Sequence, residues 1–365
     1  MRALPTALIA TVIALAAGAA EPPRYRVQPL PSMSAQRAAH SATLLRDGTV
    51  LLIGGCSSNS CEGYGATSER FDPKTGRFTP SGTMAVGRSS HTAVPLPDGR
   101  VLVTGGWTRN GVTASAEVYD PATGRFSPAG QMTTPRSDHA AVMLPNNRIL
   151  FIGGEQATQE GLASVEFYDP RDRAFHAAGT LTVPRLSHAV FLQPEGRVLV
   201  VGGRSGRGQI LDSTELYDPA TGRSTPTGKL RVPRHKFGAT MFPDWRVIVV
   251  GGSDRDESGA RYTSTEIYDP ASGVWVAGPE LTHPRYKLEG GVVALKDGRL
   301  LVAGGADVAE LLDLTTGRSE VLAGATTGAH AFATATKLED DRVLLAGGYD
   351  ARLRVTAAAW IIAPE

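Results

Sequence analysis

The chain has 365 residues, with 37 Lys and Arg against 36 Asp and Glu, and 41% of its residues are apolar. The apolar fraction excludes an intrinsically disordered chain, and a net charge of +1 gives no general attraction to nucleic acid or anionic membranes. Two cysteines exclude a disulfide-framework miniprotein and a four-cysteine zinc site. The 42 glycines and 24 prolines indicate many turns between short strands.

The first twenty residues have the outline of a secretory signal peptide. Arg2 supplies a positive start, residues 3–17 are mostly apolar, and small residues follow at 17–20. This stretch is shorter than the roughly 20 apolar residues of a comfortable membrane span, and no other stretch approaches that length. We therefore predict a signal peptide at 1–20, a single mature domain at 21–365, and a secreted or periplasmic protein without stable membrane insertion. In such an oxidising compartment, Cys56 and Cys61 are expected to form a disulfide.

The mature chain repeats a unit of about 50 residues. Residues 136–181 show its pattern: two short apolar strands joined by a turn, a glycine pair, a variable loop, and two more strands joined by an Asp-Pro turn. A repeat of this length built from four antiparallel strands predicts a β-propeller. The glycine pairs that mark seven units begin at Gly54, Gly105, Gly153, Gly202, Gly251, Gly304 and Gly347.

The two ends of the chain predict how the ring closes. The seventh unit has two strands within 330–348 and a third at 355–362, and then the chain stops before a fourth. Residues 25–33 precede the first full unit and read like the fourth strands elsewhere. We expect this N-terminal strand to complete the last blade, which removes exposed sheet edges. The predicted fold is therefore all-β, a seven-bladed propeller with four antiparallel strands per blade.

Three features carry a family resemblance: the glycine pair after an apolar strand, Tyr-Asp-Pro after the third strand, and a fourth strand that is aromatic or ends in Leu. Together they resemble the kelch repeat, over about residues 24–363, in a propeller of the galactose-oxidase-like superfamily. The resemblance implies that ligands bind just after the glycine pairs and just after the Arg that opens each blade. It does not select one activity, because one fold hosts many functions.

An Arg and a Glu recur at fixed places in six of the units. Lone buried charges are costly, so we expect one buried ion pair per blade. In the seventh unit Thr327 and Ala358 are taken to replace the two charges. The pairs expected are Arg37 with Glu69, Arg88 with Glu117, Arg136 with Glu166, Arg185 with Glu215, Arg234 with Glu266, and Arg285 with Glu310.

Histidines also repeat. Equivalent positions around a propeller form a wide circle, whereas zinc or copper needs ligands that converge to within about 2.3 Å of one point. We therefore expect hydrogen-bonded structural histidines, and no metal. The five histidines assigned to this repeat position are His40, His91, His139, His188 and His330.

Positions that vary among the units are the candidates for ligand recognition. Six of these positions form a basic sector on blades four to six: Arg204, His235, Lys236, Arg255, Tyr286 and Lys287. The Arg and Lys side chains of this sector can hold a carboxylate, sulfate or phosphate. Aromatic residues on the rim suit sugar rings or partner side chains. The candidate ligand-binding residues are Trp107, Arg109, Asp138, Glu155, Arg204, His235, Lys236, Arg255, Tyr286, Lys287 and Tyr349.

These residues favour a binding module that recognises an acidic protein segment or an anionic glycan at the propeller mouth. One alternative is a carbohydrate enzyme of mutarotase or epimerase type, with Glu155, Asp138 or His235 as acid and base. Another is a scaffold without a discrete ligand. The copper cofactor of galactose oxidase needs a Cys–Tyr crosslink, and its ligands cannot be placed on these positions. No cofactor or nucleic-acid partner is expected, and the residues do not specify an oligomeric state.

Overall fold

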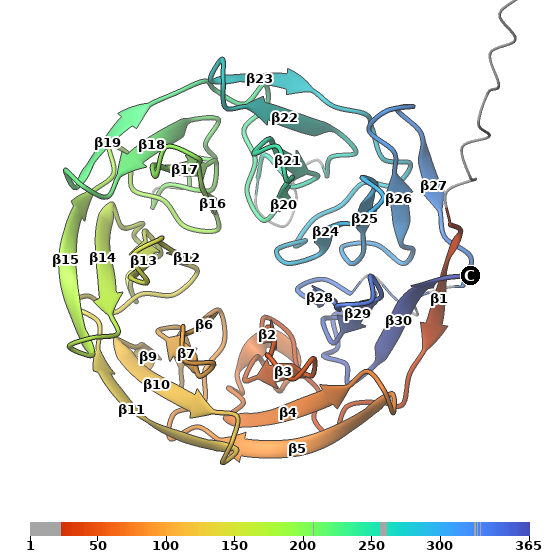
Figure 1. The fold of residues 1–365 in the computed structure, drawn as a ribbon, viewed down its shortest axis with the longest axis horizontal. Helices are drawn as coiled ribbons and strands as arrows, with labels where there is room; N and C mark the ends of the chain where they lie inside the picture. The colour runs from red at the N-terminus through yellow and green to blue at the C-terminus, as the bar shows by residue number, and fades with distance from the viewer. Residues whose placement is uncertain (1–22, 207, 256–260, 325, 327, 329) are drawn as a thin grey trace, which may run out of the picture.

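The computed structural model describes residues 23–206, 208–255, 261–324, 326, 328 and 330–365. The predicted signal peptide, residues 1–20, lies outside these ranges. In the described part, four-stranded antiparallel sheets stand around a central axis like the blades of a propeller (Figure 1). No helix of this part is long and apolar enough to cross a membrane.

Seven such sheets are present among the described residues, in agreement with the predicted blades. Within each of blades one to six the chain runs from the innermost strand outward, and a single parallel bridge between Thr180 and Arg223 joins blades three and four. Blades one to three comprise β2 (Ser41–Leu44), β3 (Val50–Ile53), β4 (Thr67–Asp72) and β5 (Arg77–Thr83); β6 (Thr92–Pro95), β7 (Val101–Thr104), β10 (Ser115–Asp120) and β11 (Arg125–Gln131); and β12 (Ala140–Met143), β13 (Ile149–Ile152), β14 (Ser164–Asp169) and β15 (Ala174–Thr180).

Blades four to six repeat this order, and short elements decorate the loops after two glycine pairs. These loop elements are η1 (Asn59–Cys61) in blade one and the ribbon of β8 (Trp107–Thr108) and β9 (Gly111–Val112) in blade two. The strands of blades four to six are β16 (Ala189–Leu192), β17 (Val198–Val201), β18 (Thr214–Asp218) and β19 (Arg223–Pro226); β20 (Gly238–Met241), β21 (Val247–Val250), β22 (Thr265–Asp269) and β23 (Val274–Ala277); and β24 (Val292–Ala294), β25 (Leu300–Val302), β26 (Glu310–Leu312) and β27 (Ser319–Val321).

The N-terminal strand closes the ring, as expected. Blade seven consists of β28 (Thr334–Lys337), β29 (Val343–Ala346) and β30 (Ala359–Pro364), and β1 (Tyr25–Pro29) pairs antiparallel with β30 as its outer strand. Figure 1 shows β1 and β30, from the two ends of the chain, side by side at the edge of the ring. Strand β30 is therefore paired on both of its edges, with β1 on one side and β29 on the other.

The hydrophobic core lies between neighbouring blades. The second strand of a blade, such as β3 or β13, is buried along its whole length because both of its faces pack on adjacent sheets. One cluster joins Leu51 and Ile53 of blade one to Val101, Val103 and Tyr119 of blade two. Since each blade supplies half of two such clusters, the ring behaves as one packed body.

A buried ion pair stands inside each of blades one to six. In blade three, Arg136 Nη2 lies 2.6 Å from Glu166 Oε1, and both side chains are almost fully buried. Arg136 Nη1 also donates to the carbonyl oxygen of Gly153, while Glu166 accepts from the backbone N–H of Thr133. The remaining pairs are Arg37–Glu69, Arg88–Glu117, Arg185–Glu215, Arg234–Glu266 and Arg285–Glu310, at 2.5 to 3.1 Å.

Blade seven departs from the assignment made on the sequence. His330, and not Thr327, takes the place of the Arg: the next residue, Ala331, bridges to Tyr349 as Ala38 bridges to Cys56. The ring Nδ1 of His330 lies 3.2 Å from the carbonyl oxygen of Gly347, the first glycine of its pair. Thr327 itself lies outside the described residues.

The acidic position of blade seven is also reassigned. Trp360, and not Ala358, takes the place of the Glu, because it pairs with Leu345 as Glu69 pairs with Leu52. Its ring meets that of His330 edge-on with centroids 4.3 Å apart. An aromatic contact thus replaces the ion pair in this blade, and His330 leaves the set of repeating histidines.

Candidate functional site

A belt of residues with left-handed backbone surrounds the axis at one end of the propeller. Each is the second residue after the opening Arg or His of its blade, and their φ angles lie between 48° and 58°. Backbone hydrogen bonds join neighbours along the belt: Ser90 N donates to Ala39 O (3.0 Å), Asp138 N to Ser90 O (3.1 Å), and Ala39 N to Phe332 O across the closure (3.1 Å). The belt residues are Ala39, Ser90, Asp138, Ser187, Lys236, Lys287 and Phe332.

The mouth, as we name the cavity of about 370 Å³ on the outer side of this belt, gathers five of the predicted ligand residues. Its size is within the usual range of small-molecule sites. Ser90, Ser187, Tyr64 and the disulfide loop complete its wall. The five predicted residues that line the mouth are Trp107, Asp138, Glu155, Arg204 and Lys236.

Acidic and basic groups alternate in the mouth. Arg204 Nη2 lies 3.7 Å from Glu155 Oε2, and the indole N–H of Trp107 donates to Glu155 Oε1 at 3.1 Å. Burial, reinforced by the nearby Asp138 carboxylate, raises the pKa of Glu155 to about 7. Burial also raises the pKa of Asp138, against the opposing effect of Lys236. At neutral pH, Glu155 therefore carries only part of a negative charge.

Other predicted residues lie around the mouth without lining it. His235 and Tyr286 are buried, with ring centroids 5.7 Å apart, and the backbone of His235 bridges to Ser253, the residue after its glycine pair. Lys287 Nζ lies over the rings of Tyr286 (5.6 Å) and Phe332 (5.4 Å). Tyr349 packs edge-on against Phe332.

Two predicted residues lie apart from the mouth. Arg109 is exposed and lines a separate hollow with Tyr64 and Thr108. Arg255 is also exposed, and its backbone carbonyl accepts hydrogen bonds from Ser253 and His235. The predicted basic sector is thus divided. Arg204 and Lys236 line the mouth, and Lys287 stacks beside it. His235, Arg255 and Tyr286 do not line the mouth.

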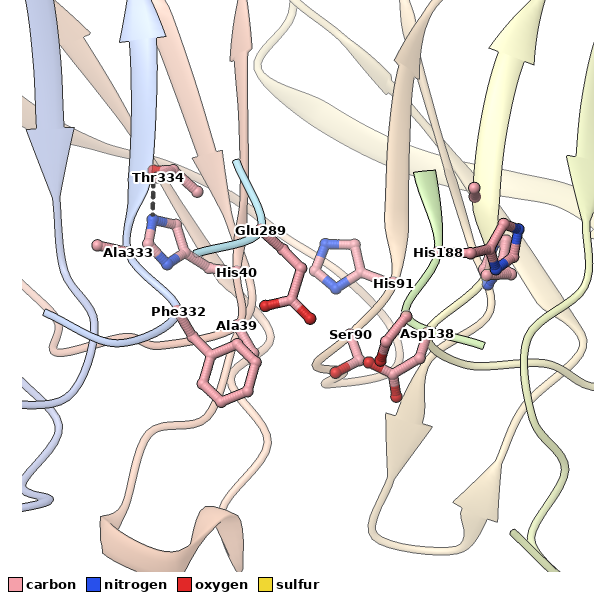
Figure 2. A pocket seen from close by; sticks show the side chains of 13 residues that line it. Ala39, His40, Ser90, His91, Asp138, His188, Glu289, Phe332, Ala333 and Thr334 are labelled. Atoms are coloured by element: carbon pink, nitrogen blue, oxygen red, sulfur yellow. Dashed lines mark hydrogen bonds between the residues drawn. The ribbon is translucent and has the colours of Figure 1, made fainter. Parts of the chain in front are cut away.

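An inner cavity of about 220 Å³ continues along the axis beneath the belt (Figure 2). The repeating histidines His40, His91, His139 and His188 line it, and three of them bind a hydroxyl of the preceding blade. His91 Nε2, for example, lies 2.9 Å from Ser41 Oγ. At the matching position next to His188 stands Ala140, so His188 has no hydroxyl partner there.

Sequence comparison missed two residues of this cavity. Phe332 occupies the belt position of blade seven, which follows His330 and not Thr327, and Glu289 projects into the cavity from blade six (Figure 2). An additional glycine pair, Gly290-Gly291, directly follows Glu289 and is the sequence signal that marks the irregularity.

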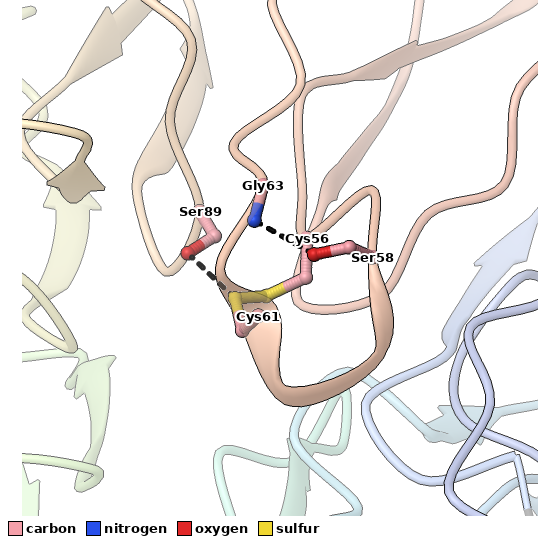
Figure 3. The surroundings of a disulfide bond; sticks show 5 residues. All are labelled: Cys56, Ser58, Cys61, Gly63 and Ser89. Atoms are coloured by element: carbon pink, nitrogen blue, oxygen red, sulfur yellow. Dashed lines mark hydrogen bonds between the residues drawn. A yellow bond between two sulfur atoms is a disulfide. The ribbon is translucent and has the colours of Figure 1, made fainter.

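Cys56 and Cys61 form the expected disulfide, and the loop that it closes is part of the mouth (Figure 3). Ser60 and Cys61 both line the cavity and have left-handed backbone (φ 65° and 56°). Cys61 Sγ lies 3.6 Å from Ser89 Oγ of the next blade. The disulfide thus closes a loop that lies against the mouth and contains two residues with left-handed backbone.

Replacing both cysteines by serine should cost little global stability. For so short a loop the chain-entropy model gives about 2 kcal/mol, a small loss for a ring of this size. Urea unfolding of the Cys56→Ser/Cys61→Ser variant should therefore show a modest shift at unchanged slope. A loss of cooperative unfolding would instead mean that the bridge supports the whole ring.

Comparisons with known proteins agree with this fold. The kelch motif matches residues 88–133 and 185–230. A fungal structure, described as a novel alcohol oxidase with catalytic diversity among the AA5 family in complex with copper, aligns with a TM-score of 0.77 at 19% identity, over 93% of this chain and 76% of the other. The structure of YjhT aligns with a TM-score of 0.63 at 15% identity, over 80% and 99%. No curated protein matches the sequence. The chain has a kelch-type β-propeller fold.

The residues present do not fit the copper–radical cofactor. Both cysteines are consumed by the disulfide, so neither is available for a crosslink to a tyrosine. Within the described ranges, no three His, Cys, Asp or Glu side chains are grouped so as to hold a metal ion.

Proposed function

We propose that the protein is a secreted or periplasmic binding module whose mouth takes an anionic glycan through a single acidic sugar unit. The observation that carries the proposal is the convergence of Arg204, Lys236, Trp107, Glu155 and Asp138 on one cavity at the axis. Arg can hold a carboxylate or sulfate with two parallel N–H bonds, and Lys adds a point charge.

The acidic residues of the mouth support this choice of ligand. A carboxyl whose pKa is raised to about 7, as in Glu155, can be protonated and donate a hydrogen bond to an anion. The aromatic ring of Trp107 offers an apolar face to a sugar ring. A cavity of about 370 Å³ suits one sugar unit better than an extended acidic peptide, which would lie across the rim.

The test is an array of acidic glycans, their neutral parents and acidic peptides, probed at low and high salt. Arg204→Ala/Lys236→Ala should weaken acidic-glycan binding at least about tenfold, because each lost charge-assisted hydrogen bond is worth roughly 1.5–3 kcal/mol. Arg109→Ala/Arg255→Ala removes the same charge outside the mouth and is the matched control. Acidic-peptide binding alone would redirect the proposal to a protein partner, and silent mouth substitutions would favour a scaffold.

A sugar mutarotase or epimerase is the second candidate. Glu155 favours it, since a carboxyl with a pKa of about 7 beside a second carboxyl is suited to proton transfer at neutral pH. His235 does not support it, because its ring is buried and faces the carbonyl oxygen of Arg255. Acceleration of anomer exchange by the protein, lost in Glu155→Gln, would establish this activity.

A further inference from the structure

Blade six departs from the repeat just before its first strand. In blade one, Ser41 lies opposite Ile53, the residue before the glycine pair, and follows Arg37 by four positions. In blade six the corresponding residue is Gly291, which accepts a hydrogen bond from Ala303 N and follows Arg285 by six positions. The other five blades keep the spacing of four, so blade six carries two extra residues at the axis.

The extra segment brings the Glu289 carboxyl into the inner cavity. Figure 2 shows it directed into the open space, with Phe332 on one side and Ser90 and Asp138 on the other. Its Oε2 atom is buried and has no hydrogen-bond partner among the described residues. Burial raises the pKa of Glu289 to about 7, with Lys236 and Lys287 opposing this effect and Asp138 adding to it.

The fold does not require this carboxyl. Six blades reach the belt without the extra residues, and an unsatisfied buried carboxyl group is unfavourable. Buried polar atoms without partners are rare in folded proteins, and each calls for a ligand, a water or a functional explanation. The cavity concentrates several: beside Glu289, the Nδ1 atoms of His40 and His139 lack partners in the described part of the chain.

The charges around the cavity restrict what it can receive. Glu289 and Asp138 line the cavity, so an anionic group would meet two carboxyls there, while Lys236, which lines the mouth, acts on the charge of Glu289 from outside the cavity. The histidines are neutral, because burial holds the pKa of His91 and His188 at about 3. An uncharged group with hydroxyl or amide functions suits these donors and acceptors, and about 220 Å³ holds roughly seven waters that it can displace.

We propose that the inner cavity is the second half of the ligand site, that it takes the hydroxyl- or amide-bearing part of the same acidic sugar, and that Glu289 hydrogen-bonds to that part. This inference rests on the proposed function, which places the anionic group of the sugar in the mouth. The ligand then spans the belt, with its charge at Arg204 and Lys236 and its neutral polar atoms below Ser90 and Asp138.

Two probes separate the halves of the site. D-glucuronate, D-galacturonate and D-mannuronate carry a carboxylate and ring hydroxyls, whereas tetrahydropyran-2-carboxylate carries the ring and carboxylate alone. Calorimetry on the wild-type protein should show at least one hexuronate binding roughly tenfold tighter than tetrahydropyran-2-carboxylate, the effect of a buried hydrogen bond. Glu289→Ala should abolish that preference and leave the affinity for tetrahydropyran-2-carboxylate unchanged. Glu289→Gln, which keeps an amide of similar size, should retain part of it.

The control is Glu195→Ala, which removes an exposed carboxylate from a hairpin of blade four and should change neither affinity. A Glu289→Ala variant that keeps the full preference would overturn the inference. If Arg204→Ala/Lys236→Ala then still abolished binding, the proposed function would stand without it. A wild-type protein that binds none of the four probes and no acidic glycan of the array would overturn the proposed function, and the inference with it.

Discussion

Replacing Glu166 by leucine should destabilise the propeller by about 3–5 kcal/mol, the usual effect of leaving one member of a buried ion pair uncompensated. Arg136 is fully buried and its Nε and Nη2 atoms both donate to Glu166 Oε1, at 3.0 and 2.6 Å. Without the carboxylate, this guanidinium has no counter-charge and no access to water. The change should appear in urea unfolding as a lower midpoint.

The double variant Arg136→Met/Glu166→Leu should be more stable than Glu166→Leu alone. It removes both charges, although it also gives up the hydrogen bonds of Arg136 to Gly153 and Ser164. Glu195→Leu, at an exposed site, is the control for the leucine itself. Equal or greater damage in the double variant would show that Arg136 acts mainly through the backbone carbonyls. Blade seven, where His330 and Trp360 stand at these positions, illustrates that the fold accepts an uncharged pair.

The protein should lose stability steeply below pH 6.5. Burial holds the pKa of His91 and His188 at about 3, and those of His40 and His139 also well below the usual value. Between pH 6 and 4 the unfolded chain therefore binds about four more protons at these histidines than the folded chain does. Acid then favours unfolding.

Carboxyls oppose part of this effect. The folded chain holds protons on Glu155 and Glu289, whose pKa values of about 7 exceed that of an unfolded glutamate, and the raised pKa of Asp138 acts in the same direction. The net excess in the unfolded chain is about one to two protons, so the unfolding free energy should fall by roughly 2 kcal/mol per pH unit near pH 5.5.

Denaturant unfolding at several pH values, with a matched pair of variants, measures this slope. His188→Phe copies blade five, where Phe237 stands at the equivalent position, and should lower the slope by about one proton, or roughly 1.4 kcal/mol per pH unit. His176→Gln, which removes a half-buried histidine on β15 outside the inner cavity, is the matched control. A slope that His188→Phe does not alter would contradict the assignment of the acid effect to this ring.

The sequence was sufficient to predict the blades because each repeats the same turns and the same apolar strands. It also predicted the closing strand β1, since the missing fourth strand of the last unit had one clear replacement. The six buried ion pairs were predictable for a similar reason: an Arg and a Glu that recur at the same positions of six units are expected to have the same partner in each.

The mouth was only partly predictable. Position after the opening Arg selected His235 and Lys236 equally, but backbone geometry separates them: the first bridges to a neighbouring loop and is buried, whereas the second turns left-handed toward the axis. Glu289 could not be predicted because it lies in an insertion that the other units lack. The opening Arg and the glycine pair, which recur in the units, do not reveal such an insertion. His330 was placed by its residue type, although its spacing to Ala331 and Gly347 marks the arginine position.

The pairing of β1 with β30 also sets the time at which the binding site comes into existence. The outer strand of blade seven is synthesised first and its partners last, so blade seven cannot be completed until the end of the chain has been made. The belt shares this seam, because Ala39 of blade one donates to Phe332 of blade seven. Without β30, strand β1 has no partner in blade seven, so the ring is not closed. The ligand binding that we propose for the mouth therefore depends on residues from both ends of the chain, because the contact that completes the belt lies at the seam where β1 pairs with β30.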